Sequence, residues 1–346
     1  MSDRLESDLL ADSPHPRETA RLIGQDAAEQ ALLAAYQSGR IHHAWILGGP
    51  EGIGKATLAY RMAKFVLTNP DPSRVGGALD LSVPPEGHAA RQVMSQSHVD
   101  LTVLRRLPNE KTKGFYSNIR VDDVRNVVRF FGSTAGAGGW RIAIIDSAED
   151  LAREGANALL KVLEEPPPRA LFLMVSHQPA RLLPTIRSRC RLLALGALSD
   201  ADVVAASAQA RPDLSSDAIA ASAALAQGSV RRALTLADGE GVALHRSLTE
   251  LLAKLPRIDV AAAHALADRC ANKAGDENFA LLLDFIDEWL HQRLLSERSE
   301  PAHRLARWAE VWEKARSAAR DVEAYNLDRK PFVLSTLSML AQASDA

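Results

Sequence analysis

Cysteine is scarce in this sequence, because its 346 residues include only two, Cys190 and Cys270. Two thiols are too few for a disulfide framework or for a zinc site built from cysteines alone. Long apolar runs are lacking as well, since no stretch reaches the roughly 18 uninterrupted apolar residues of a membrane-spanning helix. The N-terminus is acidic and lacks the basic and then apolar segments of a signal peptide. We therefore expect reduced thiols, no membrane association and a cytoplasmic location.

Aromatic residues and excess charge are also lacking. Phe, Trp and Tyr make up 5% of the chain, against 47% for all hydrophobic residues, so alanine and leucine supply much of the apolar surface. That balance favours helices over an all-β fold. The formal net charge is −2, which excludes a protein coated with positive charge for nucleic acid. At roughly 150 residues per domain, the length predicts two or three domains.

Short apolar runs alternate with helical patterns from residue 44 to residue 195. We predict strands at Ala44–Gly48, Asp100–Leu104, Arg141–Ile145, Leu171–Val175 and Cys190–Ala194. Strands that alternate with helices predict a parallel sheet with helices on both faces. The segment 68–96 is rich in proline and glycine and is predicted to be a less ordered insertion.

A phosphate-binding loop is predicted between the first strand and the helix that follows it. Residues Gly49–Lys55 match the pattern G-x-x-x-x-G-K, in which backbone N–H groups at a helix start hold phosphate. The candidate phosphate-binding residues are Gly49, Gly52, Gly54 and Lys55. The alternative is a glycine turn that only joins strand to helix. The next residue, Ala56, has no hydroxyl for Mg²⁺, and Thr57 is rotated by about 100° along the helix.

The second half of such a site is a strand that ends in a metal-binding acid, here Asp146. In P-loop ATPases of the AAA+ kind the next residue is a glutamate that polarises the attacking water, whereas this chain has Ser147, which is no base near pH 7. Glu149 and Asp150 are better interpreted as charges at a helix N-terminus. We expect a pocket that holds ATP or ADP without turnover, or that holds no nucleotide.

Two segments in the middle of the chain are more specific. They are Asn157–Pro167, with the sequence NALLKVLEEPP, and Ile186–Cys190, with the sequence IRSRC. Both closely resemble segments of the bacterial clamp-loader AAA+ proteins. Shorter matches extend the resemblance over residues 16 to about 340, at Gly24-Gln25, Gly228–Arg231 and Asn326–Lys330. The resemblance implies an α/β AAA+ P-loop module, with a parallel sheet and a helical lid, followed by an all-α collar domain.

We divide the chain into four parts, the first on its acidic composition and the others on the strand and helix patterns together with this resemblance. They are a disordered tail over 1–14, a P-loop AAA+ domain over 15–197, a helical lid over 198–240 and a helical collar for oligomerisation over 241–346. Apolar stripes in the last part, such as Leu282, Ile286 and Leu290, need partners to bury them. They form a bundle within one chain, or they pack against neighbouring subunits.

The resemblance also implies roles for single residues. In the clamp-loader family the arginine at the position of Arg189 reaches the ATP of the adjacent subunit, as an arginine finger supplied in trans. The alternative is a structural ion pair at the start of a strand. The nucleotide-sensing positions of the family match Ser176 and Arg231, although the sequence SHQP that begins at Ser176 departs from the threonine-rich version of active subunits. Arg231 either clamps phosphate or pairs with an acid. Family members often carry a four-cysteine zinc module, in whose place this chain has 68–96, so we predict no zinc and no other metal.

The function implied by the resemblance is that of a fixed subunit of a clamp loader, with no catalytic activity of its own. Its implied partners are the ATPase subunits gamma and tau, the delta subunit, and, through the complex, the sliding clamp and primed DNA. The alternatives are an active motor ATPase of the same assembly and an unrelated P-loop nucleotide switch. A local basic run can approach DNA, although a solvated loop is the favoured interpretation; it comprises Arg105, Arg106, Lys111, Lys113 and Arg120.

Overall fold

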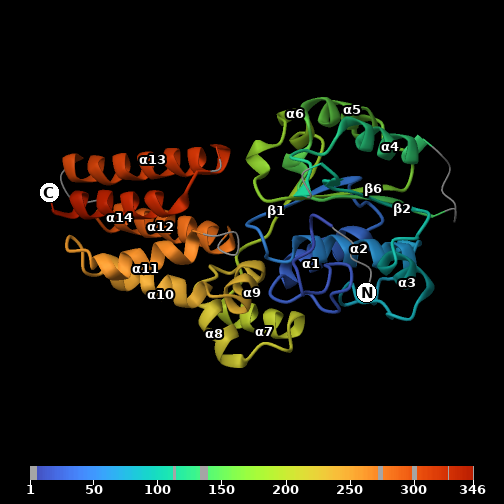
Figure 1. The fold of residues 1–346 in the computed structure, drawn as a ribbon. Coiled ribbons are helices and arrows are strands. Elements are labelled where there is room, and N and C mark those ends of the chain that lie inside the picture. Colours follow the sequence, from blue (N-terminus) through green and yellow to red (C-terminus); the bar gives the residue numbers. More distant parts are fainter. Residues whose placement is uncertain are drawn as a thin grey trace. The chain divides into compact units, whose positions relative to one another are not determined.

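The computed structural model describes residues 6–111, 114–132, 139–271, 276–297, 302–325 and 327–345. The chain divides into two compact units, the first ending at Leu234 and the second beginning at Thr235 (Figure 1). The division falls inside helix α9 (Val230–Asp238), rather than after residue 240 as predicted. In the described part of the chain, no helix is both long enough and apolar enough to cross a membrane.

The first unit is built on a parallel sheet of five strands in the order β2-β5-β6-β1-β7. The strands are β1 (Ala44–Gly48), β2 (Leu101–Leu104), β5 (Arg141–Ile145), β6 (Ala170–Ser176) and β7 (Arg191–Ala194). Each lies within one residue of its predicted bounds. The predicted parallel sheet is therefore confirmed.

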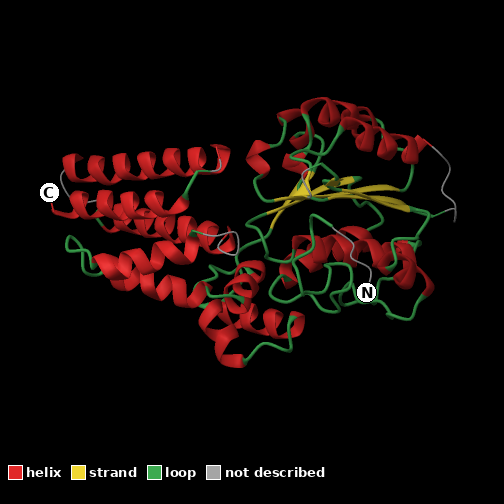
Figure 2. Ribbon diagram, viewed as in Figure 1, coloured by secondary structure: helices red, strands yellow, loops and turns green. Residues whose placement is uncertain are grey.

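Helices cover both faces of this sheet (Figure 2). Helices α1 (Asp26–Gln37) and α2 (Lys55–Thr68) pack on one face, and α4 (Val121–Gly132) and α5 (Arg153–Glu164) pack on the other. All five residues of β1 are buried, and their side chains alternate, so that Trp45 and Leu47 belong to one core and Ala44 and Ile46 to the other. A strand buried on both faces explains the continuous apolar run in the sequence.

The insertion 68–96 is more ordered than we predict from its proline and glycine content. It contains a short 3₁₀ helix η1 (Pro72–Arg74) and helix α3 (His88–Met94). Val75, Leu81 and Val93 are buried and join the core cluster that contains α2. The prediction of a less ordered insertion is wrong here, because a few well-spaced apolar residues are enough to anchor the segment. The small hairpin of β3 (Pro108–Asn109) and β4 (Gly114–Phe115) was not predicted either.

The predicted disordered tail over 1–14 is also wrong for its described part, residues 6–14. The side chains of Glu6 and Asp8 are only 6% and 3% exposed, and both form ion pairs with residues of the first unit. Burial of an acid is tolerated where opposite charge and hydrogen bonds compensate for the lost water. An acidic composition therefore did not mean a solvated segment.

Three helices, α7 (Asp200–Ala210), α8 (Ser216–Ala223) and the start of α9, form the lid of the first unit. Ser199 and Ser215 cap the first two, since their hydroxyls accept hydrogen bonds from the backbone N–H groups of Asp202 and Ala218 at 3.2 Å. A small apolar core of Leu198, Val203, Ala223, Ala226 and Ala233 holds the lid together.

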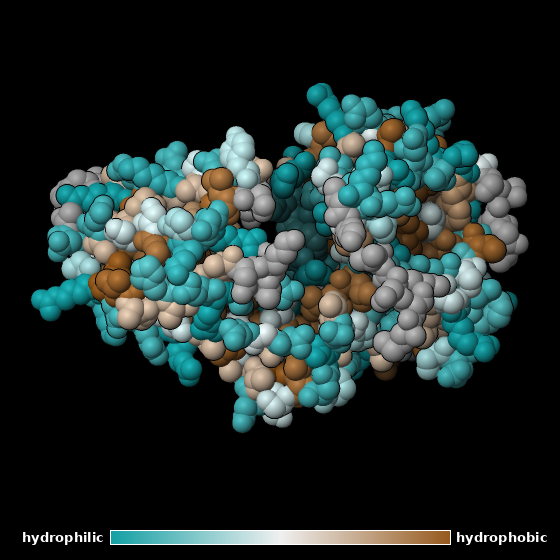
Figure 3. All heavy atoms as spheres, viewed as in Figure 1, coloured by the Kyte–Doolittle hydropathy of each residue, from teal (hydrophilic) through white to brown (hydrophobic). Residues whose placement is uncertain are grey.

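The second unit is helical. Its helices are the end of α9, α10 (Gly241–Leu252), α11 (Val260–Cys270), α12 (Asp276–Ser296), α13 (Ala302–Tyr325) and α14 (Arg329–Asp345). Leu282, Ile286 and Leu290 of the predicted stripe are buried among neighbouring helices of this unit. Of the two predicted alternatives for the stripe, a bundle within one chain is present. The visible face in Figure 3 is largely hydrophilic, with apolar residues in small patches.

Candidate functional site

A cavity of about 660 Å³ lies in the first unit, where the predicted phosphate loop meets the lid. Several parts of the chain line it: the loop residues Glu51–Lys55, residues after β2, β5 and β6, the lid, and the segment 7–23 before α1. Ala56, Thr57, Asp146, Ser147 and Arg231 also line this cavity. The structure therefore brings most of the predicted nucleotide-binding residues together.

The loop itself has the geometry that holds phosphate. Gly52 and Gly54 have φ values of 75° and 95°, in the left-handed region that favours glycine. Helix α2 begins at Lys55 with no side-chain cap on its first N–H groups. Uncapped N–H groups at a helix start attract an anion. Phosphate binding by this loop stays a prediction, which the glycine conformations and the uncapped helix start are compatible with.

Lys55 is fixed over this loop. Its Nζ donates hydrogen bonds to the carbonyl oxygens of Gly49, at 2.8 Å, and of Pro50. An ammonium group has three N–H donors, so one is left for a phosphate oxygen. The residue is 3% exposed, and burial lowers the pKa of its ammonium group to about 8. A bound phosphate would favour the charged form again.

The metal-binding half of the site is less complete. Asp146 follows β5, and burial raises the pKa of its carboxyl group to about 7, an effect that the nearby charge of Asp8 increases. Ala56 offers no oxygen at the position where a P-loop hydroxyl binds Mg²⁺. Thr57 lines the cavity and is buried. The donor set that P-loop enzymes use for Mg²⁺ therefore lacks one member here.

Position 147 holds a serine in place of the water-activating glutamate, and two acids, Glu149 and Asp150, follow it at the cavity. Ser147 has a φ of 55°, and its Oγ lies 3.3 Å from Nε2 of His177. Glu149 is the first acid after Ser147 in the sequence, and its Oε1 accepts a hydrogen bond from the backbone N–H of His177 at 2.7 Å. Asp150 forms an ion pair with Arg106 at 3.0 Å. These acids stabilise the loops that follow β5 and β6.

Ser176 lies at the end of β6 and is completely buried, and it does not line the cavity, although its neighbours Val175 and His177 do. Among the described residues, three buried polar atoms at this place have no hydrogen-bond partner: Ser176 Oγ, His177 Nδ1 and Glu149 Oε2. Unsatisfied buried polar atoms next to a cavity are typical of a place where a ligand or water binds. His177 was not singled out from the sequence, because a lone histidine in a loop carries no motif.

The lid touches the phosphate loop directly. The backbone N–H of Val230 donates to the carbonyl oxygen of Gly52 at 2.9 Å, and Arg231 forms an ion pair with Glu51 at 3.3 Å. A Cβ atom at Gly52 would lie 2.2 Å from Ser229 Oγ. Arg231 therefore lies beside the phosphate loop and pairs there with an acid, while its role in sensing nucleotide stays a prediction.

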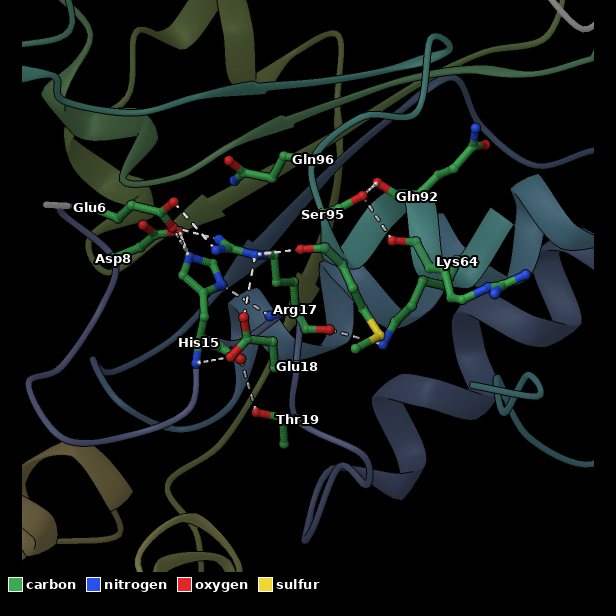
Figure 4. A network of polar contacts seen from close by, with 12 residues as sticks. Glu6, Asp8, His15, Arg17, Glu18, Thr19, Lys64, Gln92, Ser95 and Gln96 are labelled. Carbon is green, nitrogen blue, oxygen red and sulfur yellow. Dashed lines mark hydrogen bonds and ion pairs between the residues drawn. The ribbon is translucent and has the colours of Figure 1, made fainter. Parts of the chain in front are cut away.

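An ionic cluster fastens the N-terminal segment, residues 6–17, beside the cavity (Figure 4). His15 Nδ1 accepts a hydrogen bond from the backbone N–H of Arg17 at 3.1 Å, so Nε2 is the donor to Glu6 at 2.8 Å and to Asp8 at 2.9 Å. Arg105 pairs with Asp8 at 2.8 Å, and Arg17 pairs with Glu6. Burial alone would raise the pKa of both carboxyl groups, but these donors hold the two pKa values below their ordinary range.

Glu6, Asp8 and His15 also have the residue types and the spacing of a metal site. However, two guanidinium groups already balance the two carboxylates, and the donor proton of His15 occupies the nitrogen that a metal would need. We therefore interpret the cluster as an ionic anchor for the segment.

The basic run faces inward at its start. Arg105 is 13% exposed and belongs to the ionic cluster, and Arg106 pairs with Asp150. The preferred interpretation as a solvated loop is therefore wrong for Arg105. Lys111 is exposed, and Arg120 pairs with Asp123 at 3.0 Å, while Lys113 lies outside the described residues.

Arg189 lies apart from the cavity. It follows the short helix α6 (Pro184–Arg187) and precedes β7, and its side chain is 34% exposed. Its Nη2 pairs with Glu164 Oε1 at 2.7 Å, and its Nη1 donates to the carbonyl oxygen of Thr185 at 2.9 Å. The alternative of an ion pair at the start of a strand is thus present in this chain. The residue does not line the cavity that contains Lys55.

Comparison with known proteins identifies relatives for most of the chain. The family model described as "DNA polymerase III, delta subunit" matches residues 24–199. DNA polymerase III subunit delta′ of Pseudomonas aeruginosa is 36% identical over 71% of this chain and 70% of its own length. Subunit delta′ of Escherichia coli is 31% identical over 65% of this chain and 63% of its own length. Subunit tau of E. coli is 29% identical over 86% of this chain and 45% of its own length.

Proposed function

The chain belongs to the family described as DNA polymerase III, delta subunit, and we propose that it donates Arg189 to the ATP site of a neighbouring ATPase subunit without turning over nucleotide itself. The relatives named delta′ support its role as the delta-prime subunit of the clamp loader in DNA replication, rather than as an unrelated nucleotide switch. In this role it helps to load the sliding clamp onto primed DNA.

The observation that carries the proposal is the separation of Arg189 from the chain's own phosphate loop. A guanidinium group binds two phosphate oxygens through parallel, charge-assisted hydrogen bonds, a geometry that lysine cannot copy. An arginine finger supplied in trans increases the rate by about 10³- to 10⁵-fold. Because Arg189 is partly exposed and lies outside its own cavity, the ATP it serves is that of another subunit.

The chain's own pocket supports nucleotide binding without turnover. The loop glycines and Lys55 suit a phosphate group, so the pocket would hold ATP or ADP. The loss of a general base at Ser147 costs about 10²- to 10⁴-fold in rate, and Ala56 removes a Mg²⁺ ligand as well. A site that lacks both the general base and this Mg²⁺ ligand would hydrolyse ATP far more slowly than a site that has them.

The partners follow from the same proposal. The neighbour served by Arg189 is a gamma or tau subunit, and the delta subunit completes the assembly. The sliding clamp and primed DNA are reached through the complex. The helical second unit is the part that would assemble with the corresponding helices of other subunits, as a collar.

The test is to reconstitute the clamp loader with single variants and to measure its clamp-stimulated, DNA-dependent ATPase activity. We expect Arg189→Ala to lower the rate by at least about 100-fold, since it removes the finger. Arg187→Ala is the matched control, because Arg187 is exposed and two residues away, and it should leave the rate unchanged. Lys55→Ala should have little effect on this activity, because ATP bound elsewhere drives loading. Unchanged activity of Arg189→Ala would contradict the proposal.

The motor subunit of the same assembly is the second candidate, favoured by the match to tau over 86% of this chain. It predicts that the purified chain hydrolyses ATP and that Lys55→Ala abolishes the activity. Measurement of ATP hydrolysis by the chain alone separates the two candidates, since the proposed role predicts no such turnover.

A further inference from the structure

The guanidinium group of Arg189 is held at a defined place by two neighbours. Nη2 pairs with Glu164 Oε1 at 2.7 Å, while Nη1 donates to the carbonyl oxygen of Thr185 at 2.9 Å and to Ser188 Oγ at 3.3 Å. Thr185 and Ser188 belong to the same short segment as Arg189 and move with it. Glu164 is different, because it comes from helix α5, on another part of the chain.

Glu164 stands on a rigid support. It is the last residue of α5, whose residues Leu159 and Leu163 are buried in the core beneath the sheet face. The imidazole of His43, just before β1, lies within hydrogen-bond distance of the carbonyl oxygen of Leu163, with Nε2 at 3.0 Å. The backbone of Glu165 closes the helix by donating to Lys161, and Pro166 prevents its continuation. The backbone that carries Glu164 is therefore tied to the sheet.

We infer that Glu164 is a positioning residue that orients the guanidinium group of Arg189 for the ATP of the neighbouring subunit. This inference rests on the proposed function. A free arginine side chain adopts many rotamers, and fixing them on binding costs free energy. The guanidinium group has five N–H donors. The Glu164 carboxylate accepts from one edge of the group, so that other N–H groups remain to bind a phosphate. Glu164 touches no substrate itself.

The pair is suited to orienting rather than to stabilising the fold. Glu164 is 48% exposed and Arg189 is 34% exposed, so water screens their attraction. Loss of such a pair changes the stability of a protein little. An effect of Glu164 on activity without an effect on unfolding is therefore what separates positioning from a structural role.

The experiment uses the reconstituted clamp loader with Glu164→Gln, which keeps the size of the side chain and removes its charge. We expect the kcat of clamp-stimulated ATP hydrolysis to fall roughly 2- to 10-fold, which is the cost of ordering one long side chain. The KM for ATP and the melting temperature should not change. Glu165→Gln is the matched control, because Glu165 is the exposed neighbour and should behave as the unaltered protein.

A double variant links the effect to Arg189. In the Arg189→Ala background, Glu164→Gln should cause no further loss, because there is no guanidinium group left to orient. Wild-type kcat for Glu164→Gln, or the same loss with and without Arg189, would overturn the inference. If instead Arg189→Ala itself left the activity unchanged, the proposed function would fail first, so the two failures are distinguishable.

Discussion

The ionic cluster that fastens the N-terminal segment can be tested by Arg105→Met, which keeps most of the side-chain volume and removes the charge. The guanidinium group of Arg105 lies 2.8 Å from Asp8 and 3.0 Å from Glu6. Both carboxylates are almost fully buried, with side chains 3% and 6% exposed. After the substitution Asp8 keeps only His15 as a donor among these cluster residues, and a buried negative charge is left undercompensated.

Breaking a buried ion pair by removing one partner costs about 3–5 kcal/mol. Because Arg105 is itself 13% exposed, we expect the lower end, about 3 kcal/mol. The loss of global stability is limited, because the N-terminal segment can detach and return its carboxylates to water. The free energy of local opening then falls by about 3 kcal/mol, which raises hydrogen exchange of this segment about 100-fold, while global unfolding changes less.

Hydrogen exchange measured by mass spectrometry on the peptide 6–17, together with urea unfolding, gives both quantities. Arg125→Met is the control, since Arg125 pairs with Asp122 at 2.7 Å but the two side chains are 62% and 79% exposed. That pair contributes about 0.2–1 kcal/mol. Equal exchange in the Arg105 variant, the control and the unaltered protein would refute the cluster as the anchor of the segment.

Three further predictions follow from the same structure. Folding lowers the pKa values of Glu6 and Asp8. The stability that these carboxylates contribute is therefore present above their unfolded pKa values and is lost as the pH falls through the folded ones. On acidification, hydrogen exchange should rise in the N-terminal segment before it rises in the rest of the chain. Gly52→Ala should lower the melting temperature more than Gly39→Ala. Both glycines have positive φ, but only at Gly52 would the added methyl group clash with the lid, and such a clash destabilises a protein by about 1–3 kcal/mol. Burial raises the pKa of Cys190 to about 12, so it should react with a thiol reagent at pH 8 much more slowly in the folded protein than after unfolding.

The sheet could be predicted from the sequence because its signals are local. Each strand is a short, mainly apolar run, and the phosphate loop is one uninterrupted pattern of seven residues from Gly49 to Lys55. The N-terminal segment could not be predicted in this way. Asp8 and Arg105 are 97 positions apart, and nothing in either neighbourhood indicates that they meet. The contact between Glu164 and Arg189 could not be predicted either, because each residue lies in a recognisable motif and neither motif indicates that the two meet.

The phosphate loop shows why a motif and an activity are separable. Gly52 needs its φ of 75°, and the lid approaches so closely that a side chain there would meet Ser229, while its carbonyl oxygen accepts a hydrogen bond from Val230. The glycine is therefore required for the lid to close against the loop, whether or not a phosphate is hydrolysed. At Ala56 and Ser147 the groups for metal binding and water activation are missing, although Ala56 packs against the core that contains α2 and Ser147 Oγ lies 3.3 Å from His177 Nε2. The chemistry at the loop can thus be lost while its glycines are retained by packing, and the charged group that the proposal assigns to ATP stands elsewhere, at Arg189.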